Sequence, residues 1–241
     1  MEVNQNLDPF LLPYFTLIFI SIYLLAYTTI FKNWDPKIKP HASSCLISLA
    51  HGTPAILLSI SAIFHHHHFA AKNTPLQTLV LDFSIAYFFT DTSHYFIFIP
   101  NDHLFIAHHL AVLYVFITCR FVVGYGGSAV LLLLVVAEVT SPCQNAWSLA
   151  SYRKDDVALA ARLYGGLSPY FYGFYTVVRG VVGPVVVYKM VVGGGGSGEI
   201  PMWVWGSWMV VIVNGIFGSV LWVCNLWFNL FKERRKIRKL S

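Results

Sequence analysis

The chain has 241 residues, of which 56% are hydrophobic and only 11% are charged. A soluble domain carries about 25% charged residues, so this composition excludes a water-soluble globular protein. Apolar runs of roughly 20 residues, the length that spans a bilayer as a helix, recur along the chain. They do not alternate with period two as the strands of a membrane β-barrel would. We therefore predict an all-α, multi-pass transmembrane helical bundle.

The net charge of +5 does not indicate a nucleic-acid partner, because most of the excess lies in the segment 232–239, KERRKIRK. This segment directly follows an apolar run, as a juxtamembrane anchor does. The cysteines lie within or beside apolar runs and show no CxxC spacing, so we expect neither a disulfide framework nor a metal site. They are Cys45, Cys119, Cys143 and Cys224.

Turn motifs and polar loops divide the apolar sequence into about seven spans. The predicted spans are Phe10–Phe31, Ser43–Phe64, Leu76–Ile99, His103–Gly124, Gly127–Leu149, Ser168–Val192 and Met202–Phe231. Residues 1–42 form an N-terminal span with its loop, residues 43–231 a transmembrane domain, and residues 232–241 a basic cytosolic tail. The sixth span contains Arg179, Gly180 and Pro184, so both a continuous and a broken helix remain open there.

The distribution of basic residues predicts the orientation of the chain. Twelve of the sixteen lysines and arginines lie on the side of the membrane that holds the C-terminal tail. This bias predicts a cytosolic C-terminus and a lumenal N-terminus. The tract His65–His68 resembles a metal tag, but neighbours on a helix point about 100° apart, which favours interfacial polar residues over a metal site.

Ionisable residues interrupt the third, fourth and fifth spans, although a charge at the bilayer centre costs about 2.5–3.5 kcal/mol on insertion scales. From the helical rise per residue, Asp91, His108 and Glu138 lie roughly 9–17 Å from the cytosolic ends of their spans. His51 and Asn225 fall in the same layer. We therefore expect a polar pocket in the cytosolic half of the bundle.

Helical periodicity places the polar residues of three spans on single faces. These faces hold Glu138, Ser141, Pro142 and Asn145 on the fifth span, Tyr87, Asp91 and His94 on the third, and Asn214, Gly218 and Asn225 on the seventh. Interhelical hydrogen bonds of about 0.6 kcal/mol each would account for Asn214, Asn225 and Asp82. They would not require the ionisable groups Asp91 and Glu138.

The adjacent pair His108-His109 suits proton transfer, because the ordinary pKa of histidine is near neutrality. The two side chains point about 100° apart on a helix. One of them is expected to act while the other orients or packs.

Three motifs in this order resemble the TLC domain family, whose members include the ceramide synthases. They are Tyr87-Phe88-Phe89-Thr90-Asp91, His108-His109 and Glu138-x-x-Ser141-Pro142-x-x-Asn145. The spacing is more similar to the small TLC proteins than to the synthases, which follow the histidine pair with two further aspartates. In this chain the corresponding region offers only Glu138. The resemblance covers the chain from about the second span onward.

The resemblance implies six helices enclosing a lipid-accessible tunnel, with one extra N-terminal helix, in the endoplasmic reticulum or a related membrane. By analogy with the synthases, His108 or His109 would be the acid/base or acyl-carrying residue, supported by Asp91. We assign the lipid pocket to His51, Tyr87, His94, Glu138, Ser141, Asn145 and Asn225. No metal and no cofactor are expected, and membrane lipids are the expected partners.

Two functions follow from these residues. The first is a protein that binds fatty-acyl or sphingoid lipid and influences membrane lipid composition; the second is an N-acyltransferase of ceramide synthase type with acyl-CoA as co-substrate. A di-iron lipid hydroxylase is disfavoured, because the histidine spacing supplies neither HxxxH nor HxxHH boxes. A seven-span receptor is disfavoured, because the cytosolic loops are short.

Overall fold

The computed structural model describes residues 10–64, 68–194 and 198–240, and the side chains of these residues up to 232. The described residues form helices, with one isolated β-bridge between Lys72 and Tyr125. The predicted all-α, multi-pass bundle is therefore confirmed. The elements are α1 (Leu11–Leu25), η1 (Ala26–Ile30), α2 (Lys39–Ile63), α3 (Pro75–Phe98), α4 (His103–Ile117), η2 (Thr118–Val123), α5 (Gly127–Glu138), α6 (Ser141–Arg153), α7 (Ala158–Val177), η3 (Val178–Val182), α8 (Gly183–Gly194) and α9 (Met202–Leu240).

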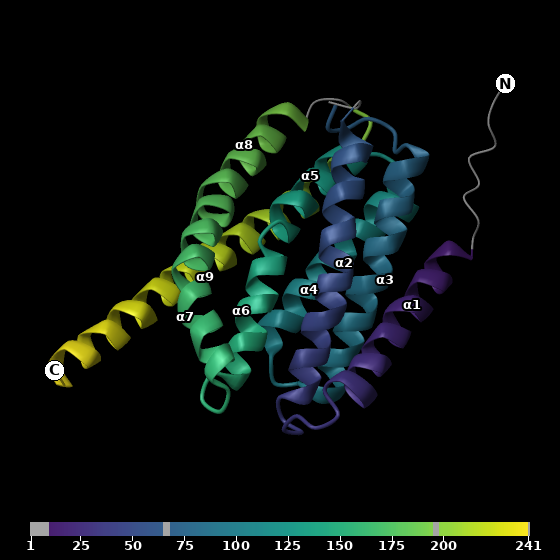
Figure 1. The fold of residues 1–241 in the computed structure, drawn as a ribbon. Coiled ribbons are helices and arrows are strands. Elements are labelled where there is room, and N and C mark those ends of the chain that lie inside the picture. The colour runs from purple at the N-terminus through teal and green to yellow at the C-terminus, as the bar shows by residue number, and fades with distance from the viewer. Residues whose placement is uncertain (1–9, 65–67, 195–197, 241) are drawn as a thin grey trace.

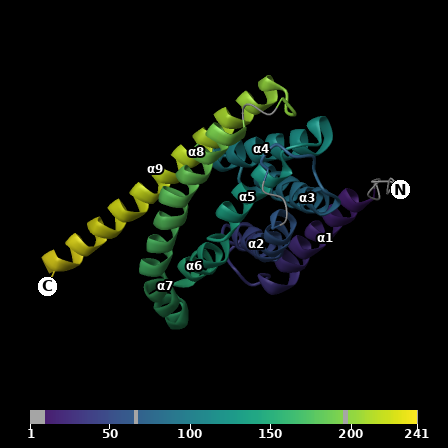
Figure 2. The same cartoon turned by 90° about the horizontal axis from the view of Figure 1, so that it is seen from above.

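Helices from six spans close into a ring, and α1 packs on the outside of this ring against α3 and α2 (Figures 1 and 2). Around the ring, α2, α3, α4, α9, α7 and α6 each contact the next, and α6 returns to α2. The helix α5 precedes α6 in the fifth span and packs against α2 and α3. This arrangement agrees with six bundled spans and one additional N-terminal helix.

Among the described residues, six helical segments are long and apolar enough to cross a membrane. The third predicted span, α3, is not one of the six: it has a suitable length of 24 residues but a more polar sequence. Its polarity has a structural reason, because α3 lies between α1, α2, α4 and α5 and faces protein along most of its length. A buried helix can carry Asp82, Asp91 and His94, since these side chains contact protein groups and not lipid.

The first four spans begin and end within four residues of their predicted limits. Two later helices are longer than predicted. The helix α7 begins at Ala158, ten residues before the predicted start, and α9 runs through the basic tail to Leu240. Hydropathy marks only the membrane-embedded part of a helix, whereas alanine, leucine, lysine, arginine and glutamate extend it readily into the polar region.

The sixth span is one continuous helix that contains the π-helical segment η3, which resolves the alternative that the sequence left open. Pro184 has no N–H group and cannot donate to the carbonyl of Gly180. The backbone adapts with a wider turn, in which the Gly183 N–H donates to the Val178 carbonyl five residues earlier. Wider turns of this type occur frequently at functional sites. Arg179 lies within this segment.

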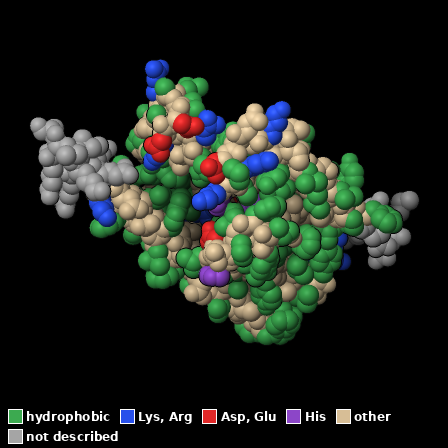
Figure 3. Space-filling view, turned by 90° about the horizontal axis from the view of Figure 1, so that it is seen from below, with side chains coloured by type: hydrophobic (Ala, Val, Ile, Leu, Met, Phe, Trp, Pro, Cys, Tyr) green, Lys and Arg blue, Asp and Glu red, His purple; other side chains and the backbone are tan. Residues whose placement is uncertain are grey.

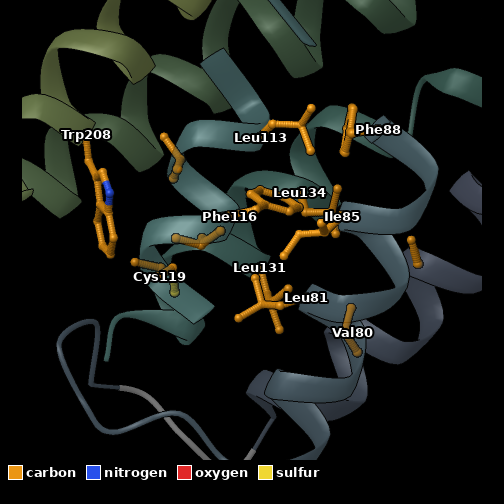
Figure 4. Close-up of a cluster of buried hydrophobic side chains, with 14 of the residues drawn as sticks. Val80, Leu81, Ile85, Phe88, Leu113, Phe116, Cys119, Leu131, Leu134 and Trp208 are labelled. Carbon is orange, nitrogen blue, oxygen red and sulfur yellow. The ribbon is translucent and has the colours of Figure 1, made fainter. Parts of the chain in front are cut away.

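The main apolar core lies between α3, α4 and α5 and extends to Trp208 of α9 (Figure 4). Asn73, which lies just before the start of α3, stabilises one end of this core. Its side chain accepts a hydrogen bond from the Gly127 N–H at 2.7 Å and donates to the Cys119 carbonyl at 3.0 Å. The segment before α3 and the starts of α5 and η2 are therefore joined through one buried amide.

Candidate functional site

The centre of the polar cluster is Asp91 on α3, whose side chain is fully buried. Its Oδ1 accepts a hydrogen bond from the Ser44 hydroxyl of α2 at 2.7 Å. Its Oδ2 lies 3.1 Å from Nε2 of His109 on α4. The carboxylate therefore bridges three helices.

The geometry of His109 defines where its protons lie. Its Nδ1 is 3.1 Å from the Phe105 carbonyl, and because a carbonyl only accepts, Nδ1 carries a proton. Nε2 then faces Asp91 as an ion-pair contact that lacks aligned hydrogen-bond geometry.

A second set of polar side chains surrounds His51, which is fully buried on α2. The His51 ring stacks on Tyr87 at a centroid distance of 4.1 Å, and its Nε2 lies 3.1 Å from the Ser84 hydroxyl. Its Nδ1 lies 3.9 Å from Oε1 of Glu138. The ring of Phe88 packs edge-on against both His51 and His109, so one aromatic side chain separates the two sets.

Gly52 permits the approach of α2 to α5 at this level. A Cβ atom on Gly52 would lie 2.8 Å from Oε2 of Glu138 and 3.7 Å from the Ser141 Cβ. Glu138 and Ser141 therefore face the same point on α2. The predicted face of the fifth span continues to Asn145, whose amide donates to the Ser48 hydroxyl of α2 at 2.8 Å.

The polar face of the fifth span coincides with a break between α5 and α6. Pro142 cannot donate to the Glu138 carbonyl, and the regular helix is interrupted at residues 139 and 140. The Ala137 carbonyl at this break accepts hydrogen bonds from the Thr140 hydroxyl at 3.3 Å and from Nη2 of Arg179 at 2.6 Å. An arginine of the sixth span is thereby brought beside Glu138.

His108 occupies a different position from its neighbour His109. Its side chain is exposed, and Arg179 is within electrostatic range. On α4 it lies about opposite to Leu110 and Ile117, which are also exposed. His108 is therefore not part of the buried contact between His109 and Asp91.

A hollow is visible on the face formed by the loops that follow η1, α3 and α6 (Figure 3). Acidic, basic and histidine side chains gather around it near the middle of this face. His108 lies five residues from the start of α4, which begins at this end of the bundle.

Two predicted pocket residues are placed elsewhere. His94 is buried, but its Nδ1 lies 2.8 Å from the Tyr23 hydroxyl, so it joins α3 to α1 at the outside of the ring. Asn225 is exposed on α9, and its side-chain oxygen accepts a hydrogen bond from Asn229 at 3.4 Å. The assignment of Asn225 to the pocket is wrong. Its position along the helix axis matches the depth of the other polar residues, but this depth does not define how far the helix lies from the centre of the bundle.

Other charged groups lie apart from the cluster. Asp82 accepts two hydrogen bonds from Arg120, at 2.8 and 3.1 Å, which is a bidentate pair between α3 and η2. A cavity of about 480 Å³ opens at the other end of the bundle. It is lined by His68, Ala70, Ala71, Lys72, Tyr125 and Glu199, and by no residue of the cluster. Within the described ranges, no three His, Cys, Asp or Glu residues are grouped so as to hold a metal ion.

The sequence did not single out four residues that build the site, namely Ser44, Gly52, Ser84 and Arg179. Serine and glycine are frequent in membrane helices and carry no individual signal. Arg179 did carry a signal, because an arginine within an apolar span is rare.

Comparison with known proteins agrees with this architecture. The family model of the TLC domain matches residues 11–231. The chain is 54% identical over 236 residues to the TLC domain-containing protein At5g14285 of Arabidopsis thaliana, an alignment that covers 94% of this chain and 93% of that protein. No solved structure matches the chain. The chain therefore belongs to the TLC domain family.

Proposed function

We propose that this membrane protein binds a fatty-acyl or sphingoid lipid inside its helical ring and thereby influences membrane lipid composition. The observation that carries this proposal is the buried polar cluster, in which Asp91, His109, His51 and Glu138 meet from four helices. Burying these groups in a membrane bundle is costly, and a purely structural role would not require ionisable side chains. The hollow on the face formed by the loops that follow η1, α3 and α6 supplies access (Figure 3).

The proposed location is the endoplasmic reticulum, with the N-terminus in the lumen and the C-terminus in the cytosol. Support for the orientation comes from the excess of basic residues at one side, and the endoplasmic reticulum is the location that the resemblance to the ceramide synthases implies. In this orientation the hollow opens toward the cytosol, where acyl donors are available.

The arrangement of His109 and Asp91 favours a second candidate, acyl transfer from acyl-CoA to an amine. In such a reaction the amine nitrogen forms a bond with the acyl carbonyl carbon, the carbon–sulfur bond breaks, and the amine loses a proton. A histidine held by a carboxylate is suited to accept that proton. In this candidate His108 would contact the reacting groups, and His109 with Asp91 would position it and hold the proton.

Both candidates are tested by lipid analysis of a deletion strain that is complemented with variants. His109→Ala and Asp91→Asn are expected to leave the lipid profile of the deletion strain uncorrected. His103→Ala is the matched control, because His103 is an exposed histidine at the start of the same helix, and it should restore the profile. Full restoration by His109→Ala, at equal protein abundance, would contradict the proposal.

Purified protein separates the two candidates. Release of CoA from acyl-CoA in the presence of a sphingoid base, lost in His109→Ala and retained in His103→Ala, would establish acyl transfer. Lipid that co-purifies with the wild type and is reduced in His109→Ala, without CoA release for any chain length, would assign a binding function.

A further inference from the structure

Arg179 is the basic residue of the sixth span that lies at the polar cluster. Its guanidinium donates to the Ala137 carbonyl at 2.6 Å and lies 5.4 Å from the centroid of the Tyr175 ring. Its Nε is buried and has no hydrogen-bond partner among the described residues. The guanidinium is permanently charged, so this site holds a fixed positive charge within the membrane.

Within the described part of the chain, Arg179 forms no ion pair within 4 Å. The ion pairs in this part join His51 to Glu138, His109 to Asp91, Arg120 to Asp82 and Arg153 to Asp156, and none includes Arg179. Arg120, the other arginine deep in the bundle, has a bidentate carboxylate partner. A cation inside a membrane bundle is costly unless it is paired. The contrast between the two arginines indicates that the partner of Arg179 is supplied from outside the chain.

The surroundings of Arg179 limit what that partner can be. Glu138 is within electrostatic range but does not lie within 4 Å of the guanidinium. His108, which is exposed, is within electrostatic range of the same charge. A ligand that pairs with Arg179 therefore has a histidine and a carboxylate in its surroundings.

From this geometry we infer that the ligand is a single-chain lipid with an anionic headgroup, a carboxylate or a phosphate, which pairs with Arg179 beside His108. This inference rests on the proposed lipid-binding function and names the class of lipid. A planar guanidinium matches both headgroups, because it presents parallel N–H donors to two oxygens. The apolar chain of the ligand would lie among the apolar residues of the ring.

The test is a competition between three lipids that share one 18-carbon chain. Purified protein in dodecyl maltoside at pH 8 is equilibrated with equal amounts of oleate, oleyl phosphate and oleyl alcohol, and the bound lipids are quantified by mass spectrometry. The wild type is expected to enrich an anionic lipid over the alcohol by about tenfold or more, the size of one hydrogen bond to a charged group. Enrichment of oleate identifies a carboxylate ligand, and enrichment of oleyl phosphate identifies a phosphate ligand.

Variants of two arginines on the same span provide the control. Arg179→Met should reduce the enrichment to within about twofold of unity, and Arg179→Lys should retain part of it, because a point charge replaces the bidentate fork. Arg162→Met should behave as the wild type, because Arg162 is exposed near the start of α7. The enrichment is a ratio within each sample, so a lower yield of folded variant does not alter it.

The possible results separate this inference from the function on which it rests. Equal binding of all three lipids by the wild type would overturn the anionic headgroup and leave lipid binding intact. An anionic preference that persists in Arg179→Met would overturn the assignment to Arg179. Binding of none of the lipids above empty micelles would overturn both.

Discussion

Replacement of Gly52 by alanine tests whether the close contact between α2 and α5 fixes the position of Glu138. The new Cβ would lie 2.8 Å from Oε2, whereas ordinary contacts begin at 3.4 Å, so the carboxylate oxygen must move by at least 0.6 Å. Glu138 is buried and has little room to retreat. Overpacking of this type costs about 1–3 kcal/mol.

The matched control is Gly206→Ala on α9, where an added Cβ meets no atom within 4 Å. Both substitutions gain the same helix propensity, about 1 kcal/mol, so their difference isolates the steric effect. At about 2–4 °C per kcal/mol for a chain of this size, Gly52→Ala should melt about 2–12 °C below Gly206→Ala. Tryptophan fluorescence of detergent-solubilised protein measures both melting temperatures.

A double-mutant cycle with Glu138→Ala identifies the group that is displaced. Once the carboxylate is removed, the methyl group introduced by Gly52→Ala fits against α5, and the cost of that substitution should fall by most of its value. Equal melting of the two glycine variants, or an unchanged cost in the Glu138→Ala background, would refute the proposed packing.

Two further contacts outside the candidate site are tested by substitution: the pair of Asp82 and Arg120, and the side-chain amide of Asn73. Asp82→Asn should destabilise the protein by about 2–3 kcal/mol. This is less than the 3–5 kcal/mol expected for breaking a fully buried pair, because the Arg120 side chain is 23% exposed. Adding Arg120→Gln should recover part of the lost stability in the same melting assay. Asn73→Ala should cost about 2–3 kcal/mol through two lost hydrogen bonds and the unpaired backbone groups left behind. Asn73→Asp should cost at least as much, because it still accepts from Gly127 but turns a second, charged acceptor oxygen toward the Cys119 carbonyl; melting of Asn73→Asp above Asn73→Ala would contradict the role of the donated bond.

The sequence was sufficient to predict the helices and the position along them at which the ionisable residues meet. Hydropathy located the spans, and depth together with helical phase predicted that Asp91 and Glu138 face the interior. The same reasoning failed for Asn225, because α9 is tilted away from the other helices toward its C-terminus (Figure 1). Depth along a helix axis carries no information about tilt. Which helices become neighbours in the ring also depends on packing that no single residue signals.

The positions of Ser44, Gly52 and Ser84 illustrate this limit. Each is a small residue on α2 or α3 whose role depends on the partner that it meets. Their hydroxyl groups or lack of a side chain would be equally compatible with a lipid-facing surface. The partners become identifiable only when α2 is placed beside α3 and α5.

The arrangement of the histidine pair follows from the geometry of one helix. Consecutive residues of α4 point about 100° apart, so when His109 faces Asp91 on α3, His108 must face away from α3. His108 is exposed, whereas His109 is buried against Asp91. Two adjacent histidines therefore place one ring at a buried carboxylate and the other at an accessible surface within one helical turn. A single histidine could not occupy both positions, and a pair separated by three or four residues would place both side chains on the same face.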